Sequence, residues 1–215
     1  MDAERKITAL KVQRRNPNRV NVYLDGEFAF GLSRIVAAWL RVGQTLSEEK
    51  IRSLQEEETR EVAYQRSMHY LSFRPRSEAE VRRKLLEKGF NQPLVEEIID
   101  RLKAERWLGD AQFARLWTEN RTIFRPRSRR LLRYELRQKG VSEDHIEEAL
   151  NPLAEESELA YQAGIRYARK LTNLQPDVFR KRLMAFLARR GFSYGTIAPV
   201  VRRICSEREI EQPET

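Results

Sequence analysis

The pentapeptide Phe-Arg-Pro-Arg-Ser occurs at 73–77 and again at 124–128. In each copy, one arginine stands on either side of the proline. The two copies begin 51 residues apart in a chain of 215 residues. An arginine guanidinium presents its N–H groups in a planar fork that binds carboxylate or phosphate oxygens with two hydrogen bonds. These residue types therefore indicate recognition of an anion, and they suggest no bond-breaking chemistry.

The residues around each arginine pair predict a corner between two helices. Pro75 disfavours helical conformation at Arg74, so a helix is expected to end there. Ser77 and Glu80 form a capping box for the helix that follows, and Ser128 keeps the cap in the second copy. The turn does not require the arginines, and a cation near a helix N-terminus is slightly unfavourable. We therefore predict that the arginines contact an anionic partner.

Basic charge is concentrated in two segments of the chain. The net charge is +9 and the isoelectric point is about 9.9. Residues 121–139 contain eight basic residues and one acidic residue, a net charge of +7, and residues 180–190 contain five basic residues and no acidic one. Such segments favour a polyanionic partner. The candidate partner-binding residues are Arg74, Arg76, Arg82, Arg83, Arg121, Arg125, Arg127, Arg129, Arg130, Arg133, Arg137 and Lys139.

Residues typical of catalysis or metal binding are few. The chain contains no GxxxxGK[ST] or GxGxxG loop that would hold a phosphate. His69 and His145 belong to no HExxH motif or Cys/His cluster. The single cysteine, Cys205, is expected to be a half-buried small apolar residue. We therefore expect no enzyme activity, no cofactor and no bound metal.

The first 32 residues or so predict a small β-meander. They are rich in β-branched residues, and Asp25-Gly26 favours a tight hairpin turn. Thr45 to Glu48 resembles a capping box that opens a long helix running toward Tyr70. The predicted strands are Ile7–Val12, Val20–Leu24 and Glu27–Phe30, followed by a helical pattern at Ser33–Leu40.

The interval of 51 residues also relates Gly89, Gly140 and Gly191. Each follows a basic residue and precedes an apolar one, which is typical of a helix C-terminus with a left-handed glycine. Each is followed by a residue suited to an N-cap and by apolar residues at i, i+3, i+4 and i+7, the pattern of one helix face. With the helical pattern upstream, these features predict a three-helix unit present three times.

The predicted fold is therefore mainly α: three tandem three-helix repeats in an elongated, curved array, preceded by a small N-terminal β-meander. Neighbouring repeats are expected to share apolar surface because each is small. The predicted divisions are 1–60 for the meander and a linking helix, 61–109, 110–158 and 159–209 for the repeats, and 210–215 for a tail.

Four aromatic residues near the basic segment could stack on nucleic-acid bases. Their positions within or beside apolar-striped helices instead favour packing in the core or between repeats. We therefore predict buried or interfacial positions for Trp107, Phe113, Trp117 and Phe124.

Three segments resemble the RecX family of bacterial recombinase regulators: LSFRPRSEAEVRRKLLEKGF at 71–90, DAQFARLW at 110–117 and RPRSRRLLRYELRQKGV at 125–141. The resemblance covers roughly residues 63–205. The third repeat departs from the pattern, because it lacks Arg-Pro-Arg-Ser and has Phe179 in place of the serine. The resemblance assigns no function to the N-terminal β segment.

The resemblance implies an all-α array of three-helix repeats that binds the RecA recombinase, particularly its filament on single-stranded DNA. It implies that the protein lies in the filament groove, inhibits strand exchange and ATP hydrolysis and promotes disassembly, so that it modulates recombination, DNA repair and the SOS response. Single-stranded DNA is a second candidate partner. We expect a cytoplasmic protein, because the sequence has neither a transmembrane run nor an apolar signal core. We also expect it to be a monomer.

Two other readings remain open. The first is a helical repeat protein that binds DNA directly through the basic helices at 128–139 and 180–190, in the manner of helix-turn-helix units. In the first of these helices, Gln138 is the only amide that could read a base, which favours phosphate contact over sequence readout. The second is a helical scaffold with no anionic partner, which the net charge of +7 at 121–139 disfavours.

Overall fold

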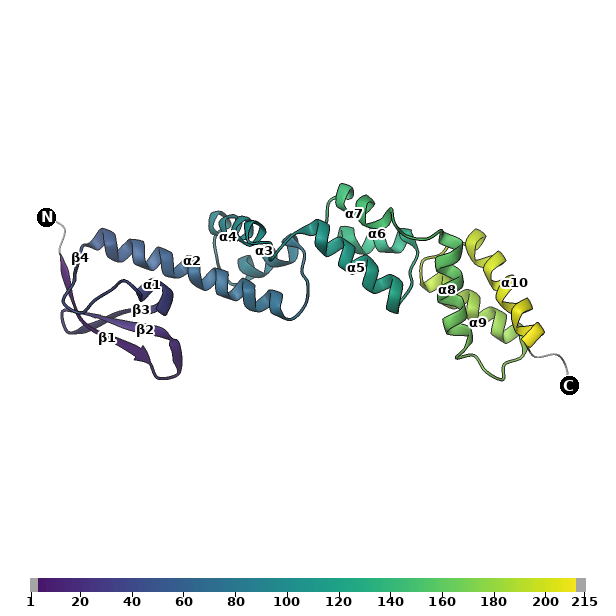
Figure 1. Ribbon diagram of the computed structural model, residues 1–215, viewed down its shortest axis with the longest axis horizontal. Helices are drawn as coiled ribbons and strands as arrows, with labels where there is room; N and C mark the ends of the chain where they lie inside the picture. The colour runs from purple at the N-terminus through teal and green to yellow at the C-terminus, as the bar shows by residue number, and fades with distance from the viewer. Residues whose placement is uncertain (1–3, 212–215) are drawn as a thin grey trace. The chain divides into compact units, whose positions relative to one another are not determined.

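The computed structural model describes residues 4–211, and the chain divides into two compact units (Figure 1). The first unit contains the chain up to Arg74 together with Val81–Glu105. The second contains Pro75–Glu80 together with the chain from Arg106 onward. The predicted combination of a small N-terminal sheet and three three-helix repeats is confirmed.

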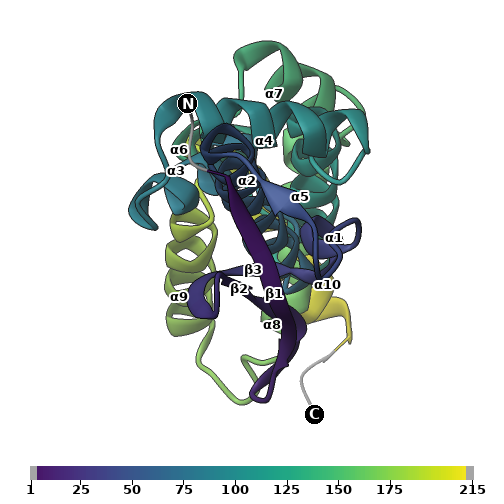
Figure 2. The same ribbon diagram turned by 90° about the vertical axis from the view of Figure 1, so that its left-hand side faces the viewer.

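The first unit begins with a four-stranded antiparallel sheet in the order β3-β2-β1-β4, whose strands face the viewer in Figure 2. Asp25 and Gly26 have φ values of 50° and 91°, which confirms the predicted hairpin turn. A meander of three strands was predicted, and the fourth strand has only two residues, too few to show a periodic pattern. The strands are β1 (Arg5–Gln13), β2 (Asn16–Leu24), β3 (Glu27–Ser33) and β4 (Thr45–Leu46).

The inner face of the sheet packs on two helices, α1 (Arg34–Ala37) and α2 (Glu48–Ser72). Val20, Val22 and Leu24 alternate along β2 and are all buried, as expected for a strand with one face on the core. The capping box predicted to begin at Thr45 is wrong, because Thr45 pairs with β1. Ser47 caps α2 instead, and its Oγ accepts a hydrogen bond from the Lys50 N–H at 3.2 Å.

A buried carboxylate fixes the sheet on α2. Glu58 accepts a hydrogen bond from the Ser33 N–H at 2.5 Å and lies 2.7 Å from Nη1 of Arg19. Its side chain is about one-tenth exposed, so both contacts form where water competes weakly. The acidic run at 56–58 thus contributes a residue to the interior of the first unit.

Helices fill the rest of the described chain in sets of three. The C-terminal part of α2 belongs to the first set, so the predicted border at residue 60 lies inside one continuous helix of 25 residues. Gly89, Gly140 and Gly191 have φ values of 84°, 77° and 87°, which confirms the left-handed helix ends. The remaining helices are α3 (Glu78–Glu87), α4 (Gln92–Ala104), α5 (Asp110–Phe124), α6 (Arg129–Gln138), α7 (Glu143–Leu150), α8 (Glu156–Ala168), α9 (Pro176–Arg189) and α10 (Tyr194–Glu211).

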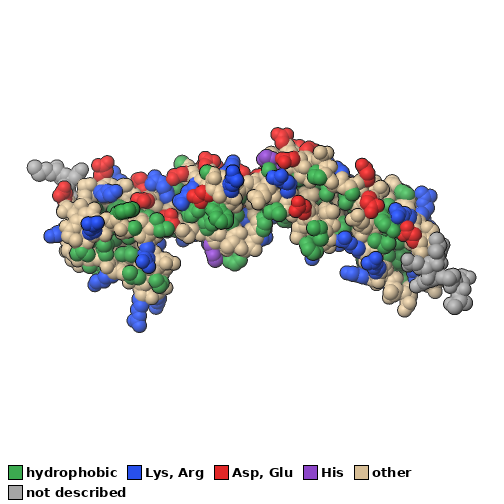
Figure 3. Space-filling view, in the orientation of Figure 1, with side chains coloured by type: hydrophobic (Ala, Val, Ile, Leu, Met, Phe, Trp, Pro, Cys, Tyr) green, Lys and Arg blue, Asp and Glu red, His purple; other side chains and the backbone are tan. Residues whose placement is uncertain are grey.

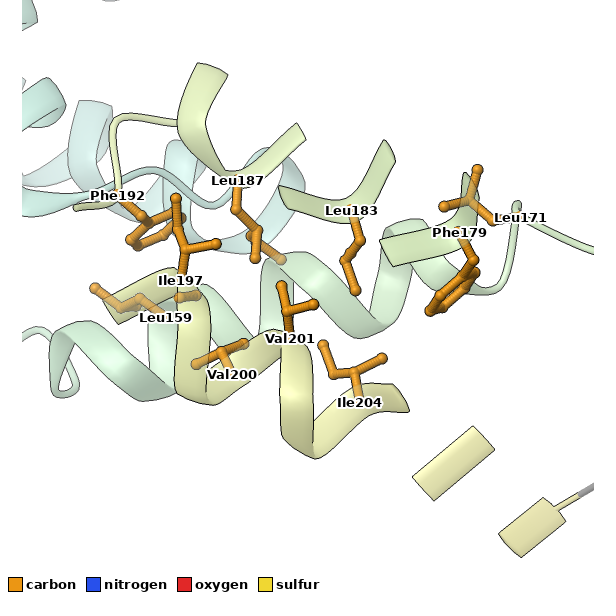
Figure 4. Packing of buried hydrophobic residues seen from close by; sticks show 12 residues of the cluster. Leu159, Leu171, Phe179, Leu183, Leu187, Phe192, Ile197, Val200, Val201 and Ile204 are labelled. Carbon is orange, nitrogen blue, oxygen red and sulfur yellow. The ribbon is translucent and has the colours of Figure 1, made fainter. Parts of the chain in front are cut away.

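The third domain, α8 to α10, shows how these small units build a core. Leu183 and Leu187 of α9 point toward Val201 of α10 in Figure 4, as expected for apolar stripes on facing helices. Gly164 of α8 permits this close packing, since a Cβ there would lie 2.7 Å from Cδ1 of Ile204. Cys205 is half-buried against the same cluster, which confirms its predicted role.

The prediction for the aromatic residues is correct for two of them and wrong for the other two. Phe113 is buried, and Trp117 packs against the same core. Trp107 and Phe124 are 58% and 72% exposed. Trp107 lies in the turn after α4, where the preceding Arg106 is left-handed, and Phe124 ends α5 at a corner. Helical periodicity does not extend into such turns.

Within residues 4–211, no three His, Cys, Asp or Glu side chains are arranged to hold a metal ion. None of the helices in that range has the length and apolar character needed to cross a membrane.

The two FRPRS corners do more than connect helices, because each docks on the glycine end of the following domain. At the first corner the Ser77 hydroxyl donates a hydrogen bond to the Lys139 carbonyl at 2.6 Å, and Lys139 Nζ lies 2.8 Å from Glu80. A Cβ on Gly140 would lie 2.5 Å from the Cβ of Ala79. This packing explains why Pro75–Glu80 belongs to the second unit.

The second corner repeats the arrangement between the second and third domains. The Ser128 N–H donates to the Arg190 carbonyl at 3.0 Å. A Cβ on Gly191 would lie 2.5 Å from Ser128 Oγ and 2.8 Å from the Cβ of Leu131. Ser77 and Ser128 are both fully buried. We call this arrangement, Ser77 on Gly140 and Ser128 on Gly191, the serine–glycine contact.

The serine–glycine contact makes two of the three equivalent glycines harder to replace. Alanine at any of them costs about 1 to 2 kcal/mol for the left-handed conformation. Gly140→Ala should cost about 1 to 3 kcal/mol more, because its Cβ meets Ala79 and the contact must open. Urea denaturation followed by circular dichroism and tryptophan fluorescence measures both losses.

Gly89→Ala is the matched control, because its φ is similar and a Cβ there would meet nothing within 4 Å. Equal losses of stability for Gly89→Ala and Gly140→Ala would contradict the proposed importance of the contact.

Candidate anion-binding surface of the second and third helical domains

The second serine–glycine contact brings together arginines that are far apart in the sequence. The hydrogen bond from Ser128 to Arg190 places the corner after α5 beside the last turn of α9. Guanidinium groups from both segments then lie close enough to influence one another electrostatically. We call this group the arginine cluster; its members are Arg121, Arg125, Arg127, Arg189 and Arg190.

One carboxylate from α6, Glu135, partly neutralises the arginine cluster. Glu135 Oε2 accepts hydrogen bonds from Arg121 Nε at 3.2 Å and from the indole N–H of Trp117 at 3.0 Å. The other oxygen of Glu135 pairs with Arg127. The Glu135 side chain is only 13% exposed, so the position of this carboxylate is well defined by its partners.

The positive charge of the cluster exceeds what Glu135 can balance. Burial lowers the pKa of Arg127, and the neighbouring charges of Arg121, Arg190 and Arg125 lower it further. Burial also lowers the pKa of Arg190, with smaller effects from Arg125 and Arg189. Repulsion among like charges thus destabilises the cationic forms, and a bound anion would relieve it.

The outward-facing donors of this surface are Arg125 and Arg189. Both are exposed, and neither forms an ion pair with any residue in 4–211. Arg130 is also exposed and reaches the Gly191 carbonyl at 3.4 Å, and Arg190 lies over the ring of Phe186 at 4.9 Å. Two exposed guanidiniums beside partly buried ones can bind carboxylate or phosphate oxygens.

Other predicted binding residues have internal roles. Arg82 forms two hydrogen bonds of 2.9 Å with Glu96 in the first unit. Arg129 donates to the carbonyls of Leu150 and Ala154 at 3.1 and 3.3 Å, close to the end of α7. Backbone carbonyls without helical partners must be satisfied, and a cation is favourable at that end of a helix. These two arginines therefore already have internal partners.

The basic face of α6 is largely paired with α7. Arg133 lies 3.1 Å from Glu143 and also contacts Glu147, and Arg137 lies 2.8 Å from Glu143. Lys139 is engaged by Glu80, as described above. The net charge of +7 at 121–139 therefore overstates the charge available to a partner, because the neutralising carboxylates come from other segments.

The remaining predicted residues lie around the first corner and on α3. Arg74 is exposed and Arg76 is half-buried, at positions equivalent to Arg125 and Arg127. Arg83 is exposed and has no ion-pair partner within the described part of the chain. Arg74, Arg82 and Arg83 belong to the first compact unit, whereas the arginine cluster belongs to the second.

The sequence-based list of binding residues omitted Arg189 and Arg190. It also omitted Arg180, Lys181 and Arg182 of α9, which are exposed and lack an ion-pair partner among residues 4–211. The absence of acidic residues between positions 180 and 190 could have identified these basic residues as candidates for binding. No residue beyond Lys139 was predicted to bind, because the third repeat lacks the Arg-Pro-Arg-Ser motif.

Removing the carboxylate within the arginine cluster should destabilise the second domain. Glu135→Ala leaves Arg121, Arg127 and the Trp117 N–H without their acceptor, at a cost of about 1.5 to 3 kcal/mol. Glu119→Ala, at an exposed position on α5, should change stability by less than about 0.5 kcal/mol. Urea denaturation followed by circular dichroism tests the difference, and equal effects would refute the assigned role of Glu135.

The exposed arginines should control binding of anions. Arg125→Ala with Arg189→Ala should weaken binding to a heparin column, because both side chains are free for an external anion. Arg133→Ala with Arg137→Ala removes the same number of charges from residues that are paired internally, so its elution should shift less. Elution of both variants at the same salt concentration would show that only net charge matters.

Comparison with known proteins assigns the whole chain to one family. The model of the regulatory protein RecX N-terminal domain matches residues 5–47. Models of the first, second and third RecX three-helix domains match residues 63–102, 110–150 and 154–201.

Named relatives and solved structures agree with this assignment. The regulatory protein RecX of Bacillus pumilus is 31% identical over 212 residues, covering 97% of this chain and 81% of that protein. The RecX of Clostridium botulinum (strain Eklund 17B) is 32% identical over 204 residues, covering 92% and 95%. A crystal structure of regulatory protein RecX superposes with a TM-score of 0.67 at 27% identity, covering 89% of this chain and 96% of that one. The chain therefore belongs to the RecX family of regulatory proteins.

Proposed function

We propose that this protein binds the RecA recombinase filament on single-stranded DNA, slows its ATP hydrolysis and strand exchange, and so modulates recombination and DNA repair. Membership of a family of regulatory proteins supports this function. The observation that carries the proposal is the arginine cluster, in which Glu135 pairs with Arg121 and Arg127 while Arg125 and Arg189 form no ion pair within residues 4–211. A filament of recombinase and DNA offers both acidic side chains and phosphates to such a surface.

The proposed action is binding, with no chemical step. The serine–glycine contact holds the second and third domains together, so that the cluster and the exposed cations of α9 belong to one compact unit. Arginine side chains already near one another lose little freedom on binding, which favours affinity. We propose that the protein acts as a cytoplasmic monomer, and a lone half-buried thiol suits a reducing compartment.

A second candidate function is direct binding to DNA. The exposed side chains of Arg180, Lys181 and Arg182 favour it, because they lie on one helix and have no carboxylate partner among the residues that the structure describes. Side chains of this kind contact phosphate and carry no base specificity.

The ATPase rate of RecA on single-stranded DNA tests the proposed function. Titrating in the protein at fixed salt should lower the rate, and Arg125→Ala with Arg189→Ala should require roughly tenfold more protein for the same inhibition, as expected for the loss of about 1.4 kcal/mol of binding free energy. Arg133→Ala with Arg137→Ala is the charge-matched control and should inhibit nearly as well as the parent protein. Absence of inhibition at several-fold excess over the filament would refute the proposal.

Binding to naked single-stranded DNA across a range of salt concentrations separates the two candidates. Under the first proposal, binding without recombinase is weak, and inhibition exceeds what DNA occupancy explains. Strong and steeply salt-dependent binding to DNA alone would favour the second candidate.

A further inference from the structure

An open groove of about 930 Å³ lies in the first unit, between the β2–α1 side of the sheet domain and helices α2 and α3. It is separate from the arginine cluster, which belongs to the second unit. Val62, Val81 and Leu85 line its apolar floor; Val81 and Leu85 are at most 2% exposed. Grooves of this volume accommodate ligands the size of a short peptide.

Cations line the same groove in excess. Arg34 and Lys88 are exposed and form no ion pair with residues 4–211, and the guanidinium of Arg66 is placed over the ring of Phe90 at 5.5 Å. Glu61 is the only carboxylate among the lining residues. It is buried and already accepts a hydrogen bond from Gln65 at 2.7 Å, so it adds little negative potential to the open groove.

The other two lining cations have local partners. Arg19 is paired with the buried Glu58 at 2.7 Å, and Lys84 lies 3.2 Å from Glu87. The charge offered to a ligand therefore comes mainly from Arg34, Arg66 and Lys88.

Exposed apolar side chains border the groove. Ile35 is 64% exposed and Phe73 is 69% exposed, and the ring of His69 packs edge-on against Phe73 at 4.8 Å. Figure 3 shows apolar side chains gathered over this part of the molecule with Lys and Arg among them. Exposed tryptophan and other aromatic residues often carry the binding energy of protein interfaces.

We propose that this groove binds an acidic peptide segment with bulky apolar side chains, supplied by a partner protein. Its carboxylates would pair with Arg34, Arg66 and Lys88, and its apolar side chains would cover Ile35 and Phe73. Charge complementarity selects an acidic partner. The exposed side chains of Ile35 and Phe73 favour a peptide over nucleic acid, because apolar side chains of a peptide can cover them and a sugar-phosphate chain cannot.

This inference goes beyond the proposed function, because it concerns the other compact unit and a protein segment instead of the filament contact of the arginine cluster. Its test therefore uses no recombinase, and failure of one proposal leaves the other standing.

The test is fluorescence anisotropy with the full chain and a fluorescein-labelled 12-residue peptide of glutamates with interspersed leucine and phenylalanine. We expect saturable binding, and much weaker binding of two matched peptides, one with lysine for glutamate and one with alanine for the apolar residues. Arg34→Glu with Lys88→Glu should weaken binding about tenfold or more, and Phe73→Ala should weaken it several-fold. All three side chains are exposed, so the thermal midpoint should stay unchanged.

Lys50→Glu with Arg52→Glu is the matched control, because both side chains are exposed on α2 outside the groove. This variant carries the same net charge and should bind the acidic peptide like the parent protein. Equal weakening by both double variants, or no saturable binding, would overturn the proposal. Groove-dependent binding of a 12-nucleotide oligothymidine in place of the peptide would also overturn it, in favour of nucleic acid.

Discussion

The arrangement of the second unit depends on the contact between a buried serine and the glycine end of the following domain. Ser77 bonds to the carbonyl of Lys139, and Ala79 beside it leaves no room for a Cβ on Gly140; Ser128 itself leaves no room for a Cβ on Gly191. Glycine satisfies two requirements there, because it takes the left-handed conformation that ends a helix and also permits the neighbouring corner to approach. A domain of three short helices buries little apolar surface alone, so the contact of Ser128 with Gly191 also fixes the third domain on the second.

The same contact explains why positive charge accumulates where it does. A corner that docks on a helix C-terminus brings the arginines around Pro126 beside the basic residues that precede Gly191. Most other arginines of the second domain are neutralised by carboxylates of α7 or bound to backbone carbonyls. The net charge of a sequence segment therefore differs from the charge that its side chains can offer to a partner. Only the charge of side chains without internal carboxylate partners attracts a binding partner strongly.

The first unit combines the same kind of helical packing with a small sheet. Glu58 bonds both to Arg19 and to the backbone of Ser33, and these contacts fix the sheet on α2. A groove remains open between the sheet domain and helices α2 and α3. Three of its lining cations, Arg34, Arg66 and Lys88, form no ion pair with residues 4–211. The sheet thus contributes residues such as Arg19 and Ser33 to a surface that the helical repeats alone would lack.

The sequence by itself determined the glycine helix ends, the caps at Ser77 and Ser128, and the threefold repeat. These features depend on residues within one or two turns, such as Gly140, and on the 51-residue interval between copies. It did not determine which arginines are available to a partner molecule, because the internal partners of Arg121, Arg129 and Arg133 lie 10 or more residues away. It also misplaced Trp107 and Phe124, whose exposure depends on how helices end and pack. Only the tertiary structure determined which residues form the arginine cluster and the groove, because both form where segments distant in sequence meet.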